Sequence, residues 1–122
     1  MHNITDLEYN NAAFHLHQAA EALYVSMLLV FTGYKPKTHN IELIENMVLE
    51  TLNDKSLTEI FPRNSATDRT LFELLKKAYI EARYSIDYAI TVDQLESLYK
   101  GVQKLQDFTL RVCAPKLPLT SI

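Results

Sequence analysis

Residues 5–31, TDLEYNNAAFHLHQAAEALYVSMLLVF, decide the fold because no proline or glycine interrupts them. Gly33 follows at the position where a helix C-terminal glycine is expected. On a helical wheel, one face collects the apolar side chains that a helix turns toward a core. These are Ala13, Leu16, Ala20, Leu23, Met27, Val30 and Phe31. The stretch therefore predicts one long helix.

A second apolar stripe lies on roughly the opposite side of this helix and consists of Leu7, Phe14, Val25 and Leu28. Gln18 and Glu21 lie among these apolar side chains. A helix that is apolar on two sides is either central in its bundle or packed against another domain or subunit. Because a monomer would leave the second stripe exposed, the pattern predicts self-association through this helix and its neighbours.

The next segments combine turns with shorter apolar repeats. Pro36 predicts a turn, after which a second helix begins near residues 38–40 and ends at Asn53 and Asp54. Between residues 55 and 64 the signals are weak: residues 56–59 resemble a capping box for one short turn, and Pro62 ends it. We expect this segment to be the most mobile loop of the protein.

Two further long helices complete the pattern. A third helix is expected from about residue 65 to residue 88, with small residues along its packing seam. The last helix begins after Thr91, because Thr91 and Gln94 match a capping box. Pro115 and Pro118 are expected to end it.

The composition supports a single helical domain. A chain of 122 residues with 48% apolar side chains is long enough for one core. Its two glycines and four prolines are too few for the many turns of a β-sandwich. Helices of matched length joined by short loops pack as an antiparallel bundle. We therefore expect one all-α domain over residues 1–122, an up-and-down antiparallel bundle of four to five helices.

The net charge, the longest apolar run and the cysteine content indicate which partners and which cellular compartment to expect. A formal net charge of −3 argues against the broad basic surface of a sequence-independent nucleic-acid binder and leaves room for a local basic pocket. The apolar run at residues 22–31 is shorter than the roughly 20 residues that span a bilayer, and it lacks the basic flank of a signal peptide. The single cysteine, Cys113, fits a reducing compartment. We expect a cytoplasmic protein without a membrane partner.

Metal and cofactor motifs are absent from the sequence. His17 and Glu21 are one helical turn apart, but no third ligand occurs at a spacing typical of a zinc site. The two glycines, Gly33 and Gly101, cannot build a glycine-rich phosphate loop. The sequence therefore predicts neither a metal site nor a cofactor.

Arg83 is the charged residue that most needs an explanation, because it lies beside the apolar seam of the predicted third helix. The favoured interpretation is an interhelical ion pair with Asp87 or Glu21 that holds the helices in register. The alternative is a contact with a phosphate or another anion, since a guanidinium presents paired donors. Tyr84 and Tyr88 are candidates for stacking on a nucleobase.

Three segments together resemble a known family. Residues 14–21, FHLHQAAE, are similar to the signature on the first helix of HEPN domains, nucleotide-binding domains shared by prokaryotes and higher eukaryotes. Residues 33–40, GYKPKTHN, are similar to the family's turn into the second helix, and residues 78–84, AYIEARY, to its later segment. The resemblance spans nearly the whole chain in the expected order.

The resemblance implies an all-α up-and-down bundle that is commonly dimeric. It also implies a nucleotidyltransferase partner, because such domains are often encoded beside or fused behind a minimal nucleotidyltransferase domain. The helical pattern begins almost directly after Met1. This would fit the C-terminal part of a longer nucleotidyltransferase-HEPN protein.

Many family members resemble RNases, with an active site made of an arginine followed a few residues later by a histidine. Arg83 matches that arginine, but Tyr88 stands after four intervening residues and no histidine follows. A tyrosine with an ordinary pKa of about 10 is a poor general base at neutral pH. The resemblance therefore implies an arginine that contacts a nucleotide or RNA, helped by Gln18, Glu21, His39 and Tyr84.

Three functions follow from these observations. The first is a non-catalytic module that binds a nucleotide or RNA and acts, as a homodimer, with a nucleotidyltransferase domain or partner. The alternative is a metal-independent RNase of a toxin-antitoxin or defence system, using Arg83 with Tyr88 or with a histidine such as His39 from another helix. The third is a structural dimerisation or docking module.

Overall fold

The computed structural model describes residues 4–116, and all regular elements of that part are helical. The elements are α1 (Ile4–Thr32), α2 (Ile41–Leu52), η1 (Lys55–Glu59), α3 (Ala66–Lys77), α4 (Glu81–Tyr84), α5 (Val92–Cys113) and η2 (Ala114–Lys116), where η marks a 3-10 turn. The predicted all-α helical bundle is confirmed. Across residues 4–116, none of these helices combines the length and apolar character needed to cross a membrane.

Local signals end α1 and bound α2 as the sequence predicts. Gly33 has a φ of 73° and its amide donates to the Leu29 carbonyl at 2.9 Å, which closes α1. The Asn40 side chain accepts hydrogen bonds from the first amides of α2. Asn53 ends α2 in the left-handed conformation, with a φ of 52°.

The start of α5 also follows the sequence. The Thr91 hydroxyl accepts from the Gln94 amide at 3.1 Å, and the Gln94 side chain accepts from the Thr91 amide at 2.9 Å. These two bonds form the predicted capping box. Pro115 lies in η2 directly after α5, whereas Pro118 lies outside the described residues.

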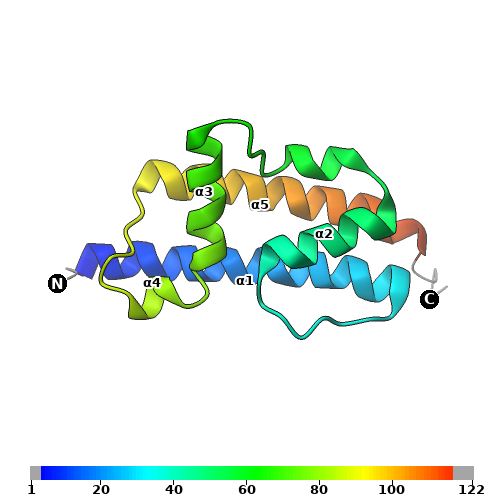
Figure 1. The fold of residues 1–122 in the computed structure, drawn as a ribbon, viewed down its shortest axis with the longest axis horizontal. Helices are drawn as coiled ribbons and strands as arrows, with labels where there is room; N and C mark the ends of the chain where they lie inside the picture. Colours follow the sequence, from blue (N-terminus) through cyan, green and yellow to red (C-terminus); the bar gives the residue numbers. More distant parts are fainter. Residues whose placement is uncertain (1–3, 117–122) are drawn as a thin grey trace, which may run out of the picture.

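The directions of the helices differ from the expected antiparallel arrangement. In Figure 1, α1 and α5 lie side by side and run the same way, both starting at the left. Ala12 and Leu95, near the two starts, line one groove, and at the other end the Lys116 ammonium lies 5.5 Å from the Phe31 ring centroid. The connection at residues 33–40 runs back along α1, so α2 begins beside the middle of α1 and also runs to the right (Figure 1).

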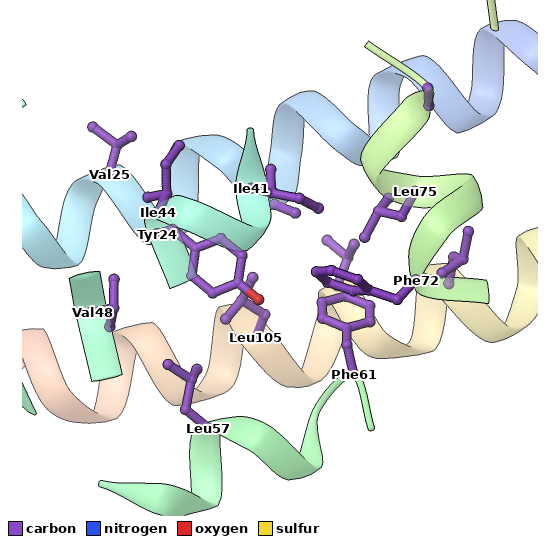
Figure 2. Close-up of a cluster of buried hydrophobic side chains, with 14 of the residues drawn as sticks. Tyr24, Val25, Ile41, Ile44, Val48, Leu57, Phe61, Phe72, Leu75 and Leu105 are labelled. Atoms are coloured by element: carbon purple, nitrogen blue, oxygen red, sulfur yellow. The ribbon is translucent and has the colours of Figure 1, made fainter. Parts of the chain in front are cut away.

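The helices form two layers around one core. The first layer consists of α1 and α5, and α2, η1 and α3 lie across it (Figure 1). Figure 2 shows side chains of both layers meeting between them. Fully buried members are Tyr24, Met27, Ile41, Ile44, Val48, Leu57, Leu75, Leu98 and Leu105. Burial of one large apolar side chain contributes about 1.5–3 kcal/mol, so this core is the main source of stability.

The second apolar stripe of α1 is mostly inside the protein, which corrects the expectation of an exposed face. Val25 is 9% exposed and Leu28 is 3% exposed, because α2 packs against this part of α1. Phe14 is half-buried, whereas Leu7 is 50% exposed. Leu7, Phe14, Val25 and Leu28 therefore do not form the surface from which we inferred self-association.

Residues 54–64 are anchored to the core, contrary to the expected mobile loop. Leu57 of η1 is fully buried and Phe61 is 5% exposed. The cap of this turn is Asp54 and not Ser56: the Asp54 carboxylate accepts from the Ser56 hydroxyl at 2.6 Å and from its amide at 3.0 Å. These hydrogen bonds lower the pKa of Asp54. Leu57 and Phe61 do not belong to a periodic apolar repeat, so the sequence pattern did not predict their burial.

The expected third long helix is broken into two. α3 ends at Lys77, a turn leads into the four-residue α4, and residues 85–91 are irregular, although the segment contains no proline or glycine. Two side chains donate hydrogen bonds to carbonyls in the last turn of α3. The Tyr88 hydroxyl donates to the Leu74 carbonyl at 2.7 Å, and His17 Nδ1 donates to the Leu75 carbonyl at 2.9 Å. In a continued helix these two carbonyls would accept from the amides of residues 78 and 79.

Candidate functional site

Three segments that are distant in the sequence meet around Tyr79, in the turn between α3 and α4. The Tyr79 ring stacks on the His39 ring, with centroids 4.3 Å apart and planes 12° apart. The rings of His17 and Phe14, both on α1, have centroids 5.4 and 6.2 Å from that of Tyr79. We call these four rings the Tyr79 cluster. It joins α1, the connection before α2 and the turn after α3.

The carboxylate of Glu21 links the two histidines of the cluster. His39 Nδ1 donates to Glu21 at 3.0 Å, and His17 Nε2 lies 3.4 Å from the same carboxylate. Because His17 Nδ1 donates to the Leu75 carbonyl, that nitrogen carries a proton. The His17 side chain is fully buried, and its Nε2 has no hydrogen-bond partner among residues 4–116, whereas the His39 side chain is 51% exposed. His39 is therefore the histidine of this group that a ligand can reach.

Arg83 of α4 is exposed and lies among aromatic rings. Its guanidinium carbon is 4.1 Å from the Phe14 centroid, 5.0 Å from that of Tyr84 and 5.5 Å from that of Tyr79. Its Nε and Nη2 donate to the Tyr79 carbonyl at 3.2 and 2.7 Å. Within the described residues, Nη1 has no hydrogen-bond acceptor, so part of the guanidinium fork is available to an anion.

Arg83 does not form the interhelical ion pair that the sequence favoured. In the described part of the chain, neither Glu21 nor Asp87 pairs with it, and Glu21 faces the two histidines instead. The break after α3 places Arg83 over Phe14, which is two helical turns, or about 10 Å, from Glu21 along α1. The expected ion pair is therefore wrong.

The remaining residues predicted for the site are distributed along the same region. Tyr84, beside Arg83, is 73% exposed. Gln18 is exposed on α1, one turn after Phe14 and just under one turn before Glu21. Of the five predicted residues, Tyr84 thus lies beside Arg83, and Glu21 accepts from His39, which belongs to the Tyr79 cluster. Gln18 lies on the helix that carries Phe14 and Glu21.

Tyr88 lies in the core and has a structural contact. It is 4% exposed, and its hydroxyl donates to the Leu74 carbonyl at 2.7 Å. Burial raises the pKa of this hydroxyl well above its ordinary value. A general base needs an accessible group with a pKa near the working pH, so this environment is unfavourable for base catalysis by Tyr88 and for stacking on a nucleobase.

A groove of about 430 Å³ opens beside the exposed side of the cluster, lined by His39, Asn40, Lys76, Lys77, Tyr79, Ile80 and Glu81. Lys76 donates to Glu42 at 3.0 Å and pairs with Glu73 at 2.9 Å, and these two carboxylates raise its pKa. Lys77 is 51% exposed and lies 3.9 Å from Glu73. Small-molecule sites span about 300–1,000 Å³, so the groove has room for a nucleotide-sized ligand.

Sequence reasoning missed the aromatic centre of the site. The sequence pattern places Phe14 in an apolar stripe and gives no role to Tyr79. No local pattern distinguishes them, because their roles depend on the turn after α3 and on the return of residues 33–40 along α1. In residues 4–116, no three His, Cys, Asp or Glu side chains are grouped to hold a metal ion.

Comparison with known proteins gives one family match. The model of the HEPN domain family matches residues 1–112. No curated protein matches the sequence. The family match includes α1 to α4 and nearly all of α5, and so it contains the whole Tyr79 cluster and Arg83.

Proposed function

The chain belongs to the HEPN domain family of nucleotide- and RNA-binding modules, and we propose that it binds a nucleotide or RNA at the surface formed by Arg83 and the Tyr79 cluster. Arg83 contacts a phosphate, Tyr84 and His39 offer ring faces to a base, and Gln18 and Glu21 supply polar contacts. The protein is proposed to work with a nucleotidyltransferase domain or partner in the cytoplasm.

The observation that supports this proposal most directly is the environment of the Arg83 guanidinium. An exposed guanidinium that has no carboxylate partner in the described residues, and is held by aromatic rings, keeps donors for an external anion. Exposed aromatic rings beside a cation are typical of surfaces that bind single-stranded nucleic acid. The groove beside His39 and Tyr79 extends this surface.

We propose a non-catalytic module, because the family's histidine after the arginine is replaced by the buried, hydrogen-bonded Tyr88. One observation favours the RNase alternative. His39, bonded to Glu21, reaches the same Tyr79 ring as Arg83 from a different segment, and a carboxylate-bound histidine is a common acid–base group.

Titration with ATP, GTP and a short RNA tests the proposal at Arg83. Arg83→Ala is expected to lower the affinity by about 1.5–3 kcal/mol, the value of a lost charged hydrogen bond. Its melting temperature should stay close to wild type, because Arg83 is exposed and no buried ion pair is broken. Arg83→Lys keeps the charge but loses the planar fork, so it should also bind more weakly.

Arg111→Ala is the matched control, because Arg111 is also exposed and lies 5.0 Å from the centroid of the Phe108 ring on another part of the protein. An Arg83→Lys variant that binds as tightly as wild type would show that the site is wrongly assigned. RNA cleavage that Arg83→Ala and His39→Ala both abolish would support the enzyme. Absence of both binding and cleavage would support the docking module.

We also propose that the protein is a homodimer, with a surface different from the one first expected. A groove of about 540 Å³ runs between α1 and α5 and is lined by Ala12, His15, Leu16, Leu95, Glu96, Tyr99 and Lys100. Apart from Gln18, which we assign to the ligand, the exposed positions of α1 from Asn11 to Leu29 are Asn, His, Ala, Ser and Leu, and this lack of charged side chains is typical of an interface.

A further inference from the structure

The end of α3 determines where Arg83 lies. Residues 74–83 consist largely of good helix formers, and the sequence predicts that the helix continues through them. A continued helix would carry Arg83 about 9 Å beyond Lys77 at 1.5 Å per residue. Figure 1 shows α3 running onto α1, so this continuation would point past α1 instead of turning along it. The contact between Arg83 and Phe14 therefore depends on the break.

Three side chains act as hydrogen-bond donors at the break. Tyr88 donates to the Leu74 carbonyl and His17 to the Leu75 carbonyl, at 2.7 and 2.9 Å. In a continuous helix these carbonyls would accept from the amides of residues 78 and 79. Here the Ala78 amide donates instead to the Leu75 carbonyl, at 3.3 Å. The Tyr79 amide has no backbone acceptor in the described part of the chain. The third donor is Arg83 itself, on the Tyr79 carbonyl.

We propose that His17 and Tyr88 are positioning residues of the ligand site. They end α3 at the turn where Tyr79 stacks on His39, and so place Arg83 over Phe14. Both side chains are buried, His17 fully and Tyr88 with 4% exposure, so neither touches a ligand directly. The inference rests on the proposed function of Arg83, and it assigns to two core residues an effect on ligand binding.

Paired substitutions separate the hydrogen bond from the bulk of the side chain. His17→Asn retains an N–H close to the position of Nδ1, whereas His17→Gln carries its amide farther out, near the position of Nε2. Tyr88→Phe removes a single oxygen atom and keeps the buried ring. It therefore tests the proposal independently of how well His17→Gln folds.

Amide hydrogen exchange at Ala78 and Tyr79 gives a readout that a merely structural role would not produce. If the donors end the helix, Tyr88→Phe should free the Leu74 carbonyl for the Ala78 amide, and His17→Gln should free the Leu75 carbonyl for the Tyr79 amide. Exchange should therefore slow at Ala78 in the first variant and at Tyr79 in the second. Simple loss of stability would make exchange faster. His17→Asn should exchange like wild type. Unchanged or faster exchange at Ala78 in Tyr88→Phe, together with unchanged or faster exchange at Tyr79 in His17→Gln, would overturn the proposal.

Titration with ATP and a short single-stranded RNA supplies the functional readout. Tyr88→Phe and His17→Gln are expected to bind about tenfold more weakly, comparable to loss of one charged hydrogen bond, while His17→Asn stays near wild type. Slowed exchange with unchanged affinity would contradict a role in ligand binding. Arg83→Ala, measured alongside, tests the proposed function separately: unchanged affinity in that variant shows that Arg83 is not the ligand contact, whatever exchange at Tyr79 shows.

Discussion

At the scale of single residues, the least expected feature is a charge buried at the centre of the fold. Glu45 of α2 is fully buried, and its carboxylate accepts from Arg63 and, at 3.0 Å, from the Tyr24 hydroxyl. The Arg63 guanidinium carbon lies 3.9 Å from the Phe72 ring centroid. Burial, and then the neighbouring Glu45, raise the pKa of Tyr24. The charge of Glu45 is tolerated because both partners are in place.

Substitution of Arg63 should show how strongly an unpaired Glu45 carboxylate destabilises the protein. We expect Arg63→Met to lower the free energy of unfolding by about 3–5 kcal/mol, because Glu45 would remain in the core without its counter-ion. Glu45→Gln in the same chain should recover part of that loss, since the amide oxygen can still accept from Tyr24. Urea unfolding of both single variants and the double variant measures the coupling. Losses that simply add would show that the pair is not coupled.

At the scale of elements, the packing of α5 against residues 54–64 depends on one glycine. Gly101 lies inside α5 and is buried, and a Cβ atom there would overlap the Phe61 ring. Phe61 in turn has its ring centroid 6.1 Å from that of Phe72 in α3. The glycine thus allows the segment before α3 to approach α5 closely.

Gly101→Ala should destabilise the protein although alanine is the better helix former. The propensity gain is about 1 kcal/mol, but displacing the Phe61 ring from a packed core costs about 1–3 kcal/mol. Gln103→Ala, at an exposed position of the same helix, is the control and should be neutral or slightly stabilising. Thermal unfolding compares them. A Gly101→Ala variant more stable than wild type would mean that Phe61 moves freely.

At the scale of the whole molecule, α2, η1 and α3 cover one side of the α1–α5 pair (Figure 1). The groove lined by Leu16, Leu95 and Tyr99 lies between these two helices. A two-fold dimer would bring one copy of this groove against another. The proposed interface therefore lies on the α1–α5 pair and leaves Arg83 of α4 to the ligand.

The oligomeric state tests this arrangement. We expect a dimer at micromolar concentration by sedimentation, and Tyr99→Glu should shift it to monomer by placing a charge in the apolar contact. Tyr34→Glu is the matched control, because Tyr34 and Tyr99 are 55% and 54% exposed and Tyr34 lies outside the groove. A monomeric wild type, or equal effects of both substitutions, would contradict the proposed interface.

The sequence by itself determined the helical class and the ends of α1, α2 and α5. These ends depend on Gly33, Asn40, Asn53 and the Thr91–Gln94 pair, whose partners lie within four residues along the chain. The sequence also indicated Arg83, Glu21 and His39 through the family resemblance. Local hydrogen bonds and short motifs can be predicted in this way because all their atoms belong to one stretch of chain.

Only the tertiary structure decided the end of α3, the parallel course of α1 and α5, and the partners of Arg83. The donor that closes α3 at Leu75 is His17, 58 positions earlier in the chain. Phe14 and Tyr79 become neighbours only after the chain has folded back across α1. Such contacts depend on which surfaces meet once the core is buried, and a local pattern carries no information about a donor on another helix.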